Sequence, residues 1–434
     1  MSHFPLENAL FALFCRYLPH NQRHLQRLAA VCAAVQLARK VHLPFIARYL
    51  PQPISRRSRV RFLERFLHAA LFQDATFYQL LLQQALRHYR QPIWHLVIDR
   101  TNWVPKQLDL LMISLAYHKR AVPVAWQLQP CGASSSSSQI DLLEKTRRYL
   151  PTSQPIILHG DAEFGSVALM QYLTHQVGWE FILGQSSLLR FHSGDWQWQQ
   201  VSQLPVAPSR PFYAENLFLT RRHNFGPLNL FAFFAPYQLG PHEPQKQFRY
   251  FATSLPTARP LRRLGKRRWG CEPMFRDFKS SGWEMAHSAL LDPAARLALL
   301  QVLAIDYLWA VSLGRWLVKS GQACHFLGQK NDLSAYSGLA GTGSFASIIP
   351  CRRSRHGYAF IPDAATFMRK TSPLFRILLW VREPDGLGNP SAKQRQHALA
   401  DVVADFTEDG QHLGIAALGR RRVREAEVHL APGA

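Results

Sequence analysis

The chain has few acidic residues. Asp and Glu together number 28 in 434 residues, against 51 Lys and Arg, so the formal net charge at pH 7 is +23. Such an excess attracts polyanions and raises their association rates, which makes nucleic acid the leading predicted partner and an acidic membrane surface the second. The 47% hydrophobic and 12% aromatic content excludes a disordered basic protein. A chain of this length allows about three domains with sizeable cores.

Cysteine motifs and membrane signals are also missing. The six cysteines are scattered, without a Cys-x-x-Cys pair or the Cys/His spacing of a zinc site, so we expect reduced thiols. The N-terminus carries Glu7 and lacks a basic stretch leading into an apolar run, so no secretory signal is expected. The longest apolar region, residues 289–318, is interrupted by Asp292, Arg296 and Asp306. Charges are costly in a bilayer, so this region is predicted to form core helices, and no membrane partner is expected.

The first 88 residues contain no strand-like run, and we predict a helical domain. Within it, Arg57, Arg61 and Arg65 recur every four residues opposite an apolar helix face. This pattern predicts a basic helix packed on a core. We expect the helix to contact DNA, and an ordinary solvated basic face is the alternative.

Residues 89–185 have the pattern of a mixed α/β region. The nearly continuous apolar run 93–98 is typical of a strand buried on both faces, and Asp99 follows it directly. Residues 108–117 and 121–128 predict two further strands in an antiparallel meander. Pro123 cannot donate to a ladder, so it places the third strand at an edge of the sheet.

A second acidic residue follows a later strand. The apolar run 155–158 predicts a strand that ends just before Asp161, after a helical crossover. Parallel neighbouring strands present their carboxyl ends at the same edge of a sheet. If the two strands are neighbours, Asp99 and Asp161 converge there. An Asp after a strand is often only a turn residue, which is the alternative for either one alone.

The rest of the chain divides into three parts. Aromatic residues in short runs, separated by Pro, Gly and Asn, predict an inserted β-rich subdomain at 186–258. Residues 259–318 carry the third acidic motif and helical patterns. Residues 319–434 contain long Gly/Ser-rich and Pro/Gly-rich loops and a basic tail, and we expect a mostly helical C-terminal region. Dimerisation is one hypothesis for its role.

Cations surround Glu272 in the third motif. Five of the seven residues 262–268 are Arg or Lys, among them Lys266, Arg267 and Arg268. On a continuous helix, Glu272 and Lys279 share one face, with Arg276 one turn from the glutamate. The alternative is an exposed helix with ordinary surface ion pairs.

A proline complicates the third motif. Pro273 is tolerated only in the first turn of a helix, so a helix starting there leaves Arg268 outside it.

Three carboxylates beside cations suit phosphodiester cleavage. Two Mg²⁺ ions held about 3.5 to 4 Å apart can activate water and stabilise charge on the attacking and leaving oxygens. Mg²⁺ takes oxygen ligands and uses only a few protein carboxylates. A metal-free carboxylate pair could instead hydrolyse glycosides, but the basic surroundings favour a polyanionic substrate.

The motifs together resemble those of bacterial insertion-sequence transposases with a DDE triad. They read Asp99-Arg-Thr-Asn-Trp103, Gly160-Asp161-Ala-Glu-Phe164 and Arg268-x3-Glu272-x6-Lys279. The similar branch has a β-strand insertion between the second Asp and the Glu and a Tyr-Arg-Glu-Lys signature. The spacings agree, because 161 − 99 = 62 and 272 − 161 = 111, and the longer interval contains the β-rich segment. The resemblance covers roughly residues 20–320, and Gly265 stands where the signature has Tyr.

The resemblance implies an α/β fold with an RNase H-like catalytic core. It implies that Asp99, Asp161 and Glu272 ligate Mg²⁺ or Mn²⁺, with two ions, for cut-and-paste chemistry. Arg268 and Lys279 would contact DNA near the scissile phosphate. The expected partner is double-stranded DNA, at the terminal inverted repeats and the target, with a homodimer in the synaptic complex. The expected location is cytoplasmic and nucleoid-associated.

Two alternatives remain open at this point. One is a metal-dependent nuclease without strand transfer. The other is an inactive or repurposed DNA-binding protein, which Gly265 and Pro273 keep open.

Residues next to the motifs have more ordinary expected roles. Trp103 and Phe164 are predicted to pack in the core, and Glu163 to support the site or lie on the surface. His159 is expected to be a hydrogen-bonded core residue, with a general base as the alternative. Trp283 is also expected to pack, with stacking on a flipped base as the alternative.

Overall fold

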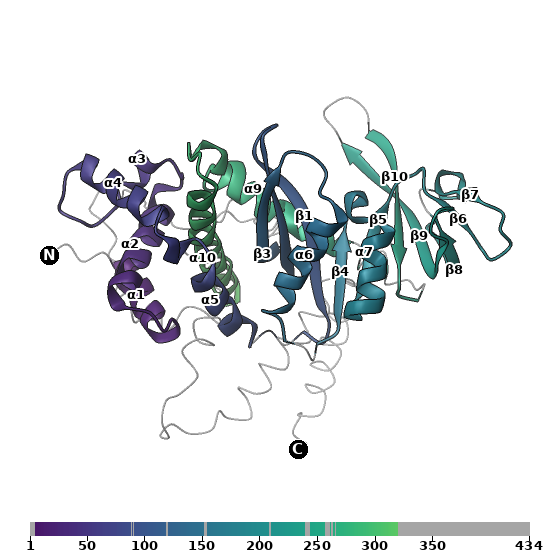
Figure 1. The fold of residues 1–434 in the computed structure, drawn as a ribbon, viewed down its shortest axis with the longest axis horizontal. Helices are drawn as coiled ribbons and strands as arrows, with labels where there is room; N and C mark the ends of the chain where they lie inside the picture. Colours follow the sequence, from purple (N-terminus) through teal and green to yellow (C-terminus); the bar gives the residue numbers. More distant parts are fainter. Residues whose placement is uncertain are drawn as a thin grey trace, which may run out of the picture. The chain divides into compact units, whose positions relative to one another are not determined.

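Ten strands from the described residues form one continuous sheet, with helices on either side of it along the chain (Figure 1). The coordinates are a computed structural model, which describes residues 5–319 except 88, 90, 119, 152–153, 208–209, 239–243, 257–260, 262–263 and 265. The predicted C-terminal region 319–434, apart from its first residue, and the Gly265 position lie outside the described residues. The mixed α/β fold class predicted from the sequence is confirmed.

The first five strands place the acidic motifs. They are β1 (Trp94–Val104), β2 (Leu108–Tyr117), β3 (Arg120–Pro130), β4 (Ile156–Gly160) and β5 (Glu180–Gln185). Their spatial order is β3-β2-β1-β4-β5, with β1, β2 and β3 antiparallel to one another and β4 parallel to both β1 and β5. The first five residues of β1 and most of β2 are buried, and these parts of the two strands are mainly apolar.

The meander agrees closely with the sequence prediction. Strand β2 has the predicted bounds, and β3, which contains Pro123, lies at the edge of the sheet. The ladder shifts register between Ile113 and Ser114, and Ser114 is the partner of Pro123. A proline is thus accommodated at an edge and beside an irregularity, as its missing N–H requires.

The end of the first strand was predicted wrongly. Asp99 does not follow β1 but lies inside it, opposite Met112 of β2. The strand continues to Val104 because β2 goes on pairing with it after its parallel partner β4 has ended. The strand was predicted to end too early because Arg100, Thr101 and Asn102, in the second half of β1, are polar.

Strands β6 to β10 extend the same sheet beyond β5. They are β6 (Arg190–His192), β7 (Gln199–Gln200), β8 (Phe212–Leu219), β9 (Phe225–Gln238) and β10 (Pro244–Thr253). Strand β10 pairs antiparallel with β5 and β9, so the predicted β-rich segment is continuous with the sheet that carries the aspartates. Phe231, Phe233 and Phe251 stack in a small core on these strands.

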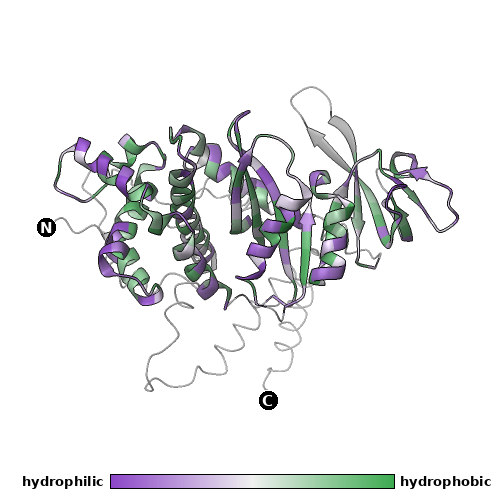
Figure 2. Ribbon diagram, in the orientation of Figure 1, coloured by the Kyte–Doolittle hydropathy of each residue, from purple (hydrophilic) through white to green (hydrophobic). Residues whose placement is uncertain are grey.

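Helices precede and follow the sheet. The N-terminal ones are α1 (Pro5–Tyr17), α2 (Gln22–Ala38), α3 (Leu43–Ile46), α4 (Arg56–Leu67), η1 (Ala70–Phe72) and α5 (Thr76–Leu86). Helix α6 (Ser136–Arg147) packs on β2 and β3, and α7 (Val167–Gln171) with η3 (Tyr172–Val177) precedes β5. In Figure 2 the central strands are largely hydrophobic, whereas α4 is largely hydrophilic.

The long apolar segment is a core helix. Helix α10 (Pro293–Lys319) contacts α2, α4, α5 and β3. The segment Pro293–Arg315 of this helix is long and apolar enough to cross a membrane. However, 78% of its most apolar stretch is buried inside the fold. Gln301 fixes it to the N-terminal helices, because its side chain donates to the Phe72 carbonyl at 2.8 Å and accepts from the Tyr78 amide at 3.2 Å.

Candidate catalytic site

Asp99 and Asp161 lie on neighbouring segments of the sheet. The parallel ladder ends where Val97 of β1 pairs with His159 of β4, so Asp99 and Asp161 each lie two residues beyond its last pair. Asp161 caps the short helix η2 (Ala162–Phe164), where its Oδ1 accepts from the Glu163 amide at 2.9 Å. The Asp99 Oδ1 accepts from the Arg100 amide at 2.8 Å. The predicted convergence of the two aspartates is therefore present, and a backbone N–H holds each carboxylate.

The backbone at Asp161 packs tightly against β5. A Cβ placed on Gly184 would come within 2.6 Å of the Ala162 nitrogen and 2.7 Å of the Asp161 carbonyl carbon. Only glycine fits at that position without moving the turn. The approach of η2 to β5 thus fixes the place of the second aspartate.

Glu272 lies more than 100 residues after Asp161, on a short helix. Helix α9 (Cys271–Arg276) follows the 3-10 turn η5 (Lys266–Gly270), so Arg268 lies outside α9 and Pro273 lies within its first turn, both as predicted. The Glu272 side chain is 53% exposed, and its Oε1 lies 3.5 Å from Nη2 of Arg268.

Arg268 connects the glutamate to the first aspartate. Its Nη1 donates to Oδ2 of Asp99 at 3.1 Å, and its side chain is only 15% exposed. Burial alone would lower the pKa of Arg268, but the charges of Asp99, Asp161 and Glu272, with Cys271, raise it overall. The guanidinium thus contacts Asp99 and Glu272 directly and is also stabilised by the charge of Asp161.

The carboxylate of Asp99 is in an unfavourable environment for its charge. Burial raises its pKa, the Asp161 charge raises it further, and Arg268 together with the Cys271 thiol opposes the rise. The Cys271 Sγ lies 2.9 Å from Oδ2 of Asp99. Burial raises the pKa of this thiol well above its usual value, so it stays protonated and can donate to the carboxylate. A largely buried carboxylate with a second one nearby is stabilised by a compensating cation.

The helix that carries Glu272 is docked on the edge strand β3. Asp277 and Arg120 form an ion pair in which both side chains are almost fully buried. A Cβ on Gly270 would come within 2.7 Å of the Arg120 carbonyl oxygen, so the turn before α9 lies directly on the start of β3. These contacts set where Glu272 emerges.

The predicted shared face of Glu272 and Lys279 is not that of a continuous α-helix. After α9 the chain enters the π-turn η6 (Asp277–Ser281), which contains Lys279. A π-turn has i→i+5 bonds and a wider turn, so seven residues no longer span two α-helical turns. Arg276 is exposed at the end of α9, and Lys279 and Arg267 are partly buried. The side chain of Lys266 lies outside the described set.

The other predicted contact residues lie on the N-terminal helices. Arg57, Arg61 and Arg65 are all exposed on α4, opposite the buried Leu63, Phe66 and Leu67. The predicted amphipathic basic helix is therefore confirmed.

The aromatic neighbours of the motifs are core residues. Trp103 and Phe164 are fully buried, as predicted, and Trp283 is 2% exposed. Stacking of Trp283 on a flipped base is ruled out as its role here, because the ring packs among Phe278 and Tyr307. His159 is buried and shares a hydrogen bond of 2.9 Å with His95, which confirms the core interpretation.

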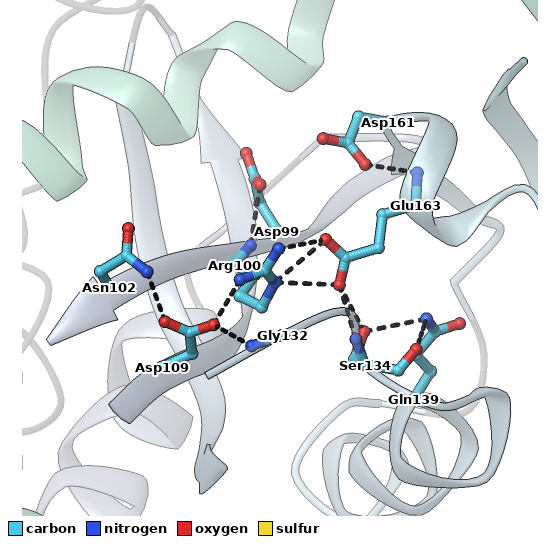
Figure 3. Close-up of polar contacts among 9 residues, drawn as sticks. All are labelled: Asp99, Arg100, Asn102, Asp109, Gly132, Ser134, Gln139, Asp161 and Glu163. Carbon is cyan, nitrogen blue, oxygen red and sulfur yellow. Dashed lines mark hydrogen bonds and ion pairs between the residues drawn. The ribbon is translucent and has the colours of Figure 1, made fainter. Parts of the chain in front are cut away.

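A polar network beside the aspartates was missed by the sequence reasoning. It joins Arg100, Asn102, Asp109, Ser134 and Glu163 (Figure 3). Its only signal in the sequence is a set of polar residues inside or next to strands that are otherwise apolar. Cys271 on Asp99 was also missed, and a lone cysteine next to Glu272 offered no signal.

The carboxylates fit a hard divalent cation in kind but are not arranged around one point. Among the described residues, no three His, Cys, Asp or Glu side chains converge closely enough to hold a metal ion. The cation between the carboxylates is the Arg268 guanidinium. Three carboxylate side chains supply the oxygen donors that Mg²⁺ prefers.

Comparison with known proteins identifies a family, and solved structures include a similar chain. The family model described as a transposase DDE domain matches residues 90–309, which contain all three carboxylates. A solved structure of a piggyBac transposase synaptic complex with hairpin DNA is similar over 89% of this chain and 83% of that chain, with 13% identity and a TM-score of 0.37. None of the curated proteins matches this chain.

Proposed function

Because the chain belongs to the family of transposases with a DDE domain, we propose that it is a cut-and-paste DNA transposase whose catalytic carboxylates are Asp99, Asp161 and Glu272. It would cleave the ends of a mobile element and join the freed 3′-hydroxyl to target DNA. The observation that carries the proposal is that Arg268, only 15% exposed, contacts both Asp99 and Glu272, while the charge of Asp161 also acts on it.

The catalytic core would be RNase H-like. Supporting this are the antiparallel β1–β2–β3 meander, the parallel β4 and β5, and the order β3-β2-β1-β4-β5. The proposed division is a helical DNA-end-binding domain at 1–88, the core at 89–185 and 259–318, an insertion at 186–258, and a C-terminal region at 319–434. In this division, strands β6 to β10 form an insertion that extends the core sheet through the pairing of β10 with β5.

Transposases of this family generally use divalent metal ions. Asp99, Asp161 and Glu272 would hold Mg²⁺ or Mn²⁺, with two ions as the proposed number. When bound, the metal supplies an activated water and stabilises negative charge on the phosphate oxygens. Arg268 neutralises Asp99 in the present arrangement, so it would release that carboxylate to the metal and turn to the DNA phosphate.

Double-stranded DNA is the proposed partner, at terminal inverted repeats and at the target. The net charge of +23 and the exposed Arg57, Arg61 and Arg65 of α4 support an end-binding surface on the N-terminal helices. Lys266, Arg267, Arg268, Arg276 and Lys279 would contact the backbone near the scissile phosphate. Synapsis of two ends would need a homodimer. The proposed location is cytoplasmic, on the nucleoid.

The proposal is tested with purified protein, Mg²⁺ and a labelled DNA fragment that carries the sequences flanking the gene. We expect end-specific breaks and joined products that disappear in Asp99→Asn and in EDTA. The matched control is Asp195→Asn, an exposed Asp on the loop after β6. Breaks without joined products would favour a nuclease, and binding without any metal-dependent break would favour an inactive or repurposed DNA-binding protein.

A further inference from the structure

Arg100 and Glu163 each stand next to one of the two aspartates. The amide of Arg100 donates to Oδ1 of Asp99 at 2.8 Å, and the amide of Glu163 donates to Oδ1 of Asp161 at 2.9 Å. The same two residues also join through their side chains (Figure 3). A chain of direct contacts therefore runs from one aspartate carboxylate to the other through this one pair.

The side-chain contact is a forked ion pair. The Arg100 Nε lies 3.0 Å from both carboxylate oxygens of Glu163, and Nη2 lies 2.9 Å from Oε2. The side chains are 24% and 17% exposed. A guanidinium that donates two N–H groups to one carboxylate fixes the direction of both planes, which a single point charge does not.

Neighbouring groups hold both partners still. The Glu163 Oε1 accepts from the amide and hydroxyl of Ser134, at 2.9 and 2.8 Å. On the other side, Arg100 Nη1 donates to Asp109, which is fully buried and also accepts from the Asn102 amide group and, at 3.1 Å, from the Gly132 backbone. Hydrogen bonds with Ser134 and Asp109, the latter held in turn by Asn102 and Gly132, therefore leave the pair little freedom.

The pair lies where the backbone ladder stops. Strands β1 and β4 are joined by backbone bonds over Trp94–Val97 and Ile156–His159. Beyond this point β4 ends and the chain turns into η2, while β1 continues along β2. Asp99 and Asp161 sit on the two diverging segments. The Arg100–Glu163 ion pair joins the two segments beyond the point where their backbone hydrogen bonds end.

We propose that Arg100 and Glu163 are positioning residues that set the separation of the Asp99 and Asp161 carboxylates and thereby the affinity of the site for divalent metal. The inference rests on the proposed function. Groups that orient metal ligands typically change metal affinity or activity roughly 10- to 100-fold when they are altered. The alternative is a brace that only stabilises the fold.

The decisive variants are Arg100→Lys and Glu163→Gln. The first keeps the charge but removes the fork, and the second keeps the shape but removes the charge. The matched control is Arg147→Lys, because Arg147 pairs with Glu144 at 3.0 Å with both side chains more than 40% exposed. For each protein, Mn²⁺ affinity is measured by the loss of the free-ion EPR signal, and the melting temperature is measured in EDTA. DNA cleavage is followed as a function of Mg²⁺ concentration.

We expect the two variants to need about 10- to 100-fold more Mn²⁺ or Mg²⁺ for half saturation and to recover most of their cleavage rate at saturating Mg²⁺. Arg147→Lys should match the wild type. A lower melting temperature with unchanged metal affinity would overturn the inference in favour of a simple brace. If Arg100→Lys does not fold, Glu163→Gln and Ser134→Ala decide between a positioning role and a brace that only stabilises the fold. Ser134→Ala removes one hydroxyl donor to Glu163. A wild type that binds no Mn²⁺ and cuts no DNA would overturn the proposed function itself, whereas metal-dependent cutting with unaltered variants overturns only the positioning role.

Discussion

The two sides of the candidate site are built in different ways. Asp99 lies in the central sheet and Asp161 directly follows one of its strands; each carboxylate accepts a backbone N–H, and the Arg100–Glu163 pair joins the two segments. Glu272 stands on the six-residue α9, is 53% exposed, and contacts Arg268 at 3.5 Å. Backbone hydrogen bonds and the Arg100–Glu163 pair thus fix the two aspartate carboxylates without any bound ligand. The position of the glutamate depends on how a short helix is docked.

The largest effect should come from removing the exposed carboxylate. Glu272→Gln should lower DNA cleavage about 10³-fold, because loss of a metal ligand removes several kcal/mol of transition-state stabilisation. Unfolding free energy should change by no more than about 0.5 kcal/mol, since the side chain is exposed. Urea unfolding and single-turnover cleavage measure the two. Asp195→Asn, at another exposed carboxylate, is the control, and a large stability loss in Glu272→Gln would show that the glutamate is part of the scaffold.

The docking of the glutamate-bearing helix should depend on pH. Burial raises the pKa of Asp277 from 3.8 to about 6, so the folded protein binds this proton more tightly than the unfolded chain. The stability from this group is complete below the unfolded pKa and is lost as pH rises through about 6, by up to about 3 kcal/mol.

Urea unfolding of the wild type and of Asp277→Asn between pH 4 and 7.5 measures the stability that the Asp277 carboxyl contributes. The difference in unfolding free energy between them should shift in favour of the variant as pH rises. A constant difference across the window would contradict it.

The aspartate side should be sensitive to backbone crowding. Gly184→Ala should cost about 1–3 kcal/mol of stability by overpacking, and it should also displace Asp161, so cleavage falls in the protein that remains folded. The control is Gly178→Ala. Its φ of +68° makes alanine strained, but a Cβ there has open space, so a similar loss of stability should leave cleavage intact. Equal losses of cleavage in both variants would show that stability alone limits activity.

The smallest effect should come from the thiol between the two sides. Cys271→Ser keeps a hydrogen-bond donor near Asp99, so cleavage should stay within about threefold of the wild type, or about 0.6 kcal/mol. The pKa of Cys271 is raised well above its usual value, so no thiolate is expected at the site. Cleavage kinetics in Mg²⁺ and in Zn²⁺ test this. A loss as large as that of Glu272→Gln would make Cys271 a ligand and change the chemistry of the site.

Much of the sheet could be predicted from local sequence. Strand β2, the edge position of Pro123 and the core role of α10 all followed from runs of apolar residues and from the missing N–H of proline. The approach of Asp99 to Asp161 followed from the geometry of parallel strands. The strand, edge and helix features depend on residues close together in the chain, and the approach of the aspartates needs only the pairing of two strands.

The rest depends on contacts between distant residues. Asp99 looked like the end of a strand because Arg100, Thr101 and Asn102 are polar, and only the partner β2 shows why the strand continues. The Arg268 contact with Asp99 spans 169 positions. The π-turn after α9 and the joining of β10 to β5 likewise carry no local signal. The roles of the basic residues and the domain boundaries remain predictions.

The central claim is that Asp99, Asp161 and Glu272 act as one metal-dependent site although one lies in a strand, one follows a strand and the third lies on a short helix. The most direct measurement is Mn²⁺ affinity, by EPR, for the wild type, Asp99→Asn, Glu272→Gln and the double variant, each with a DNA end bound. Ligands of one site are strongly coupled, so the double variant should lose no more affinity than the worse single variant. Losses that multiply, or a Glu272→Gln protein that binds Mn²⁺ like the wild type, would contradict the claim.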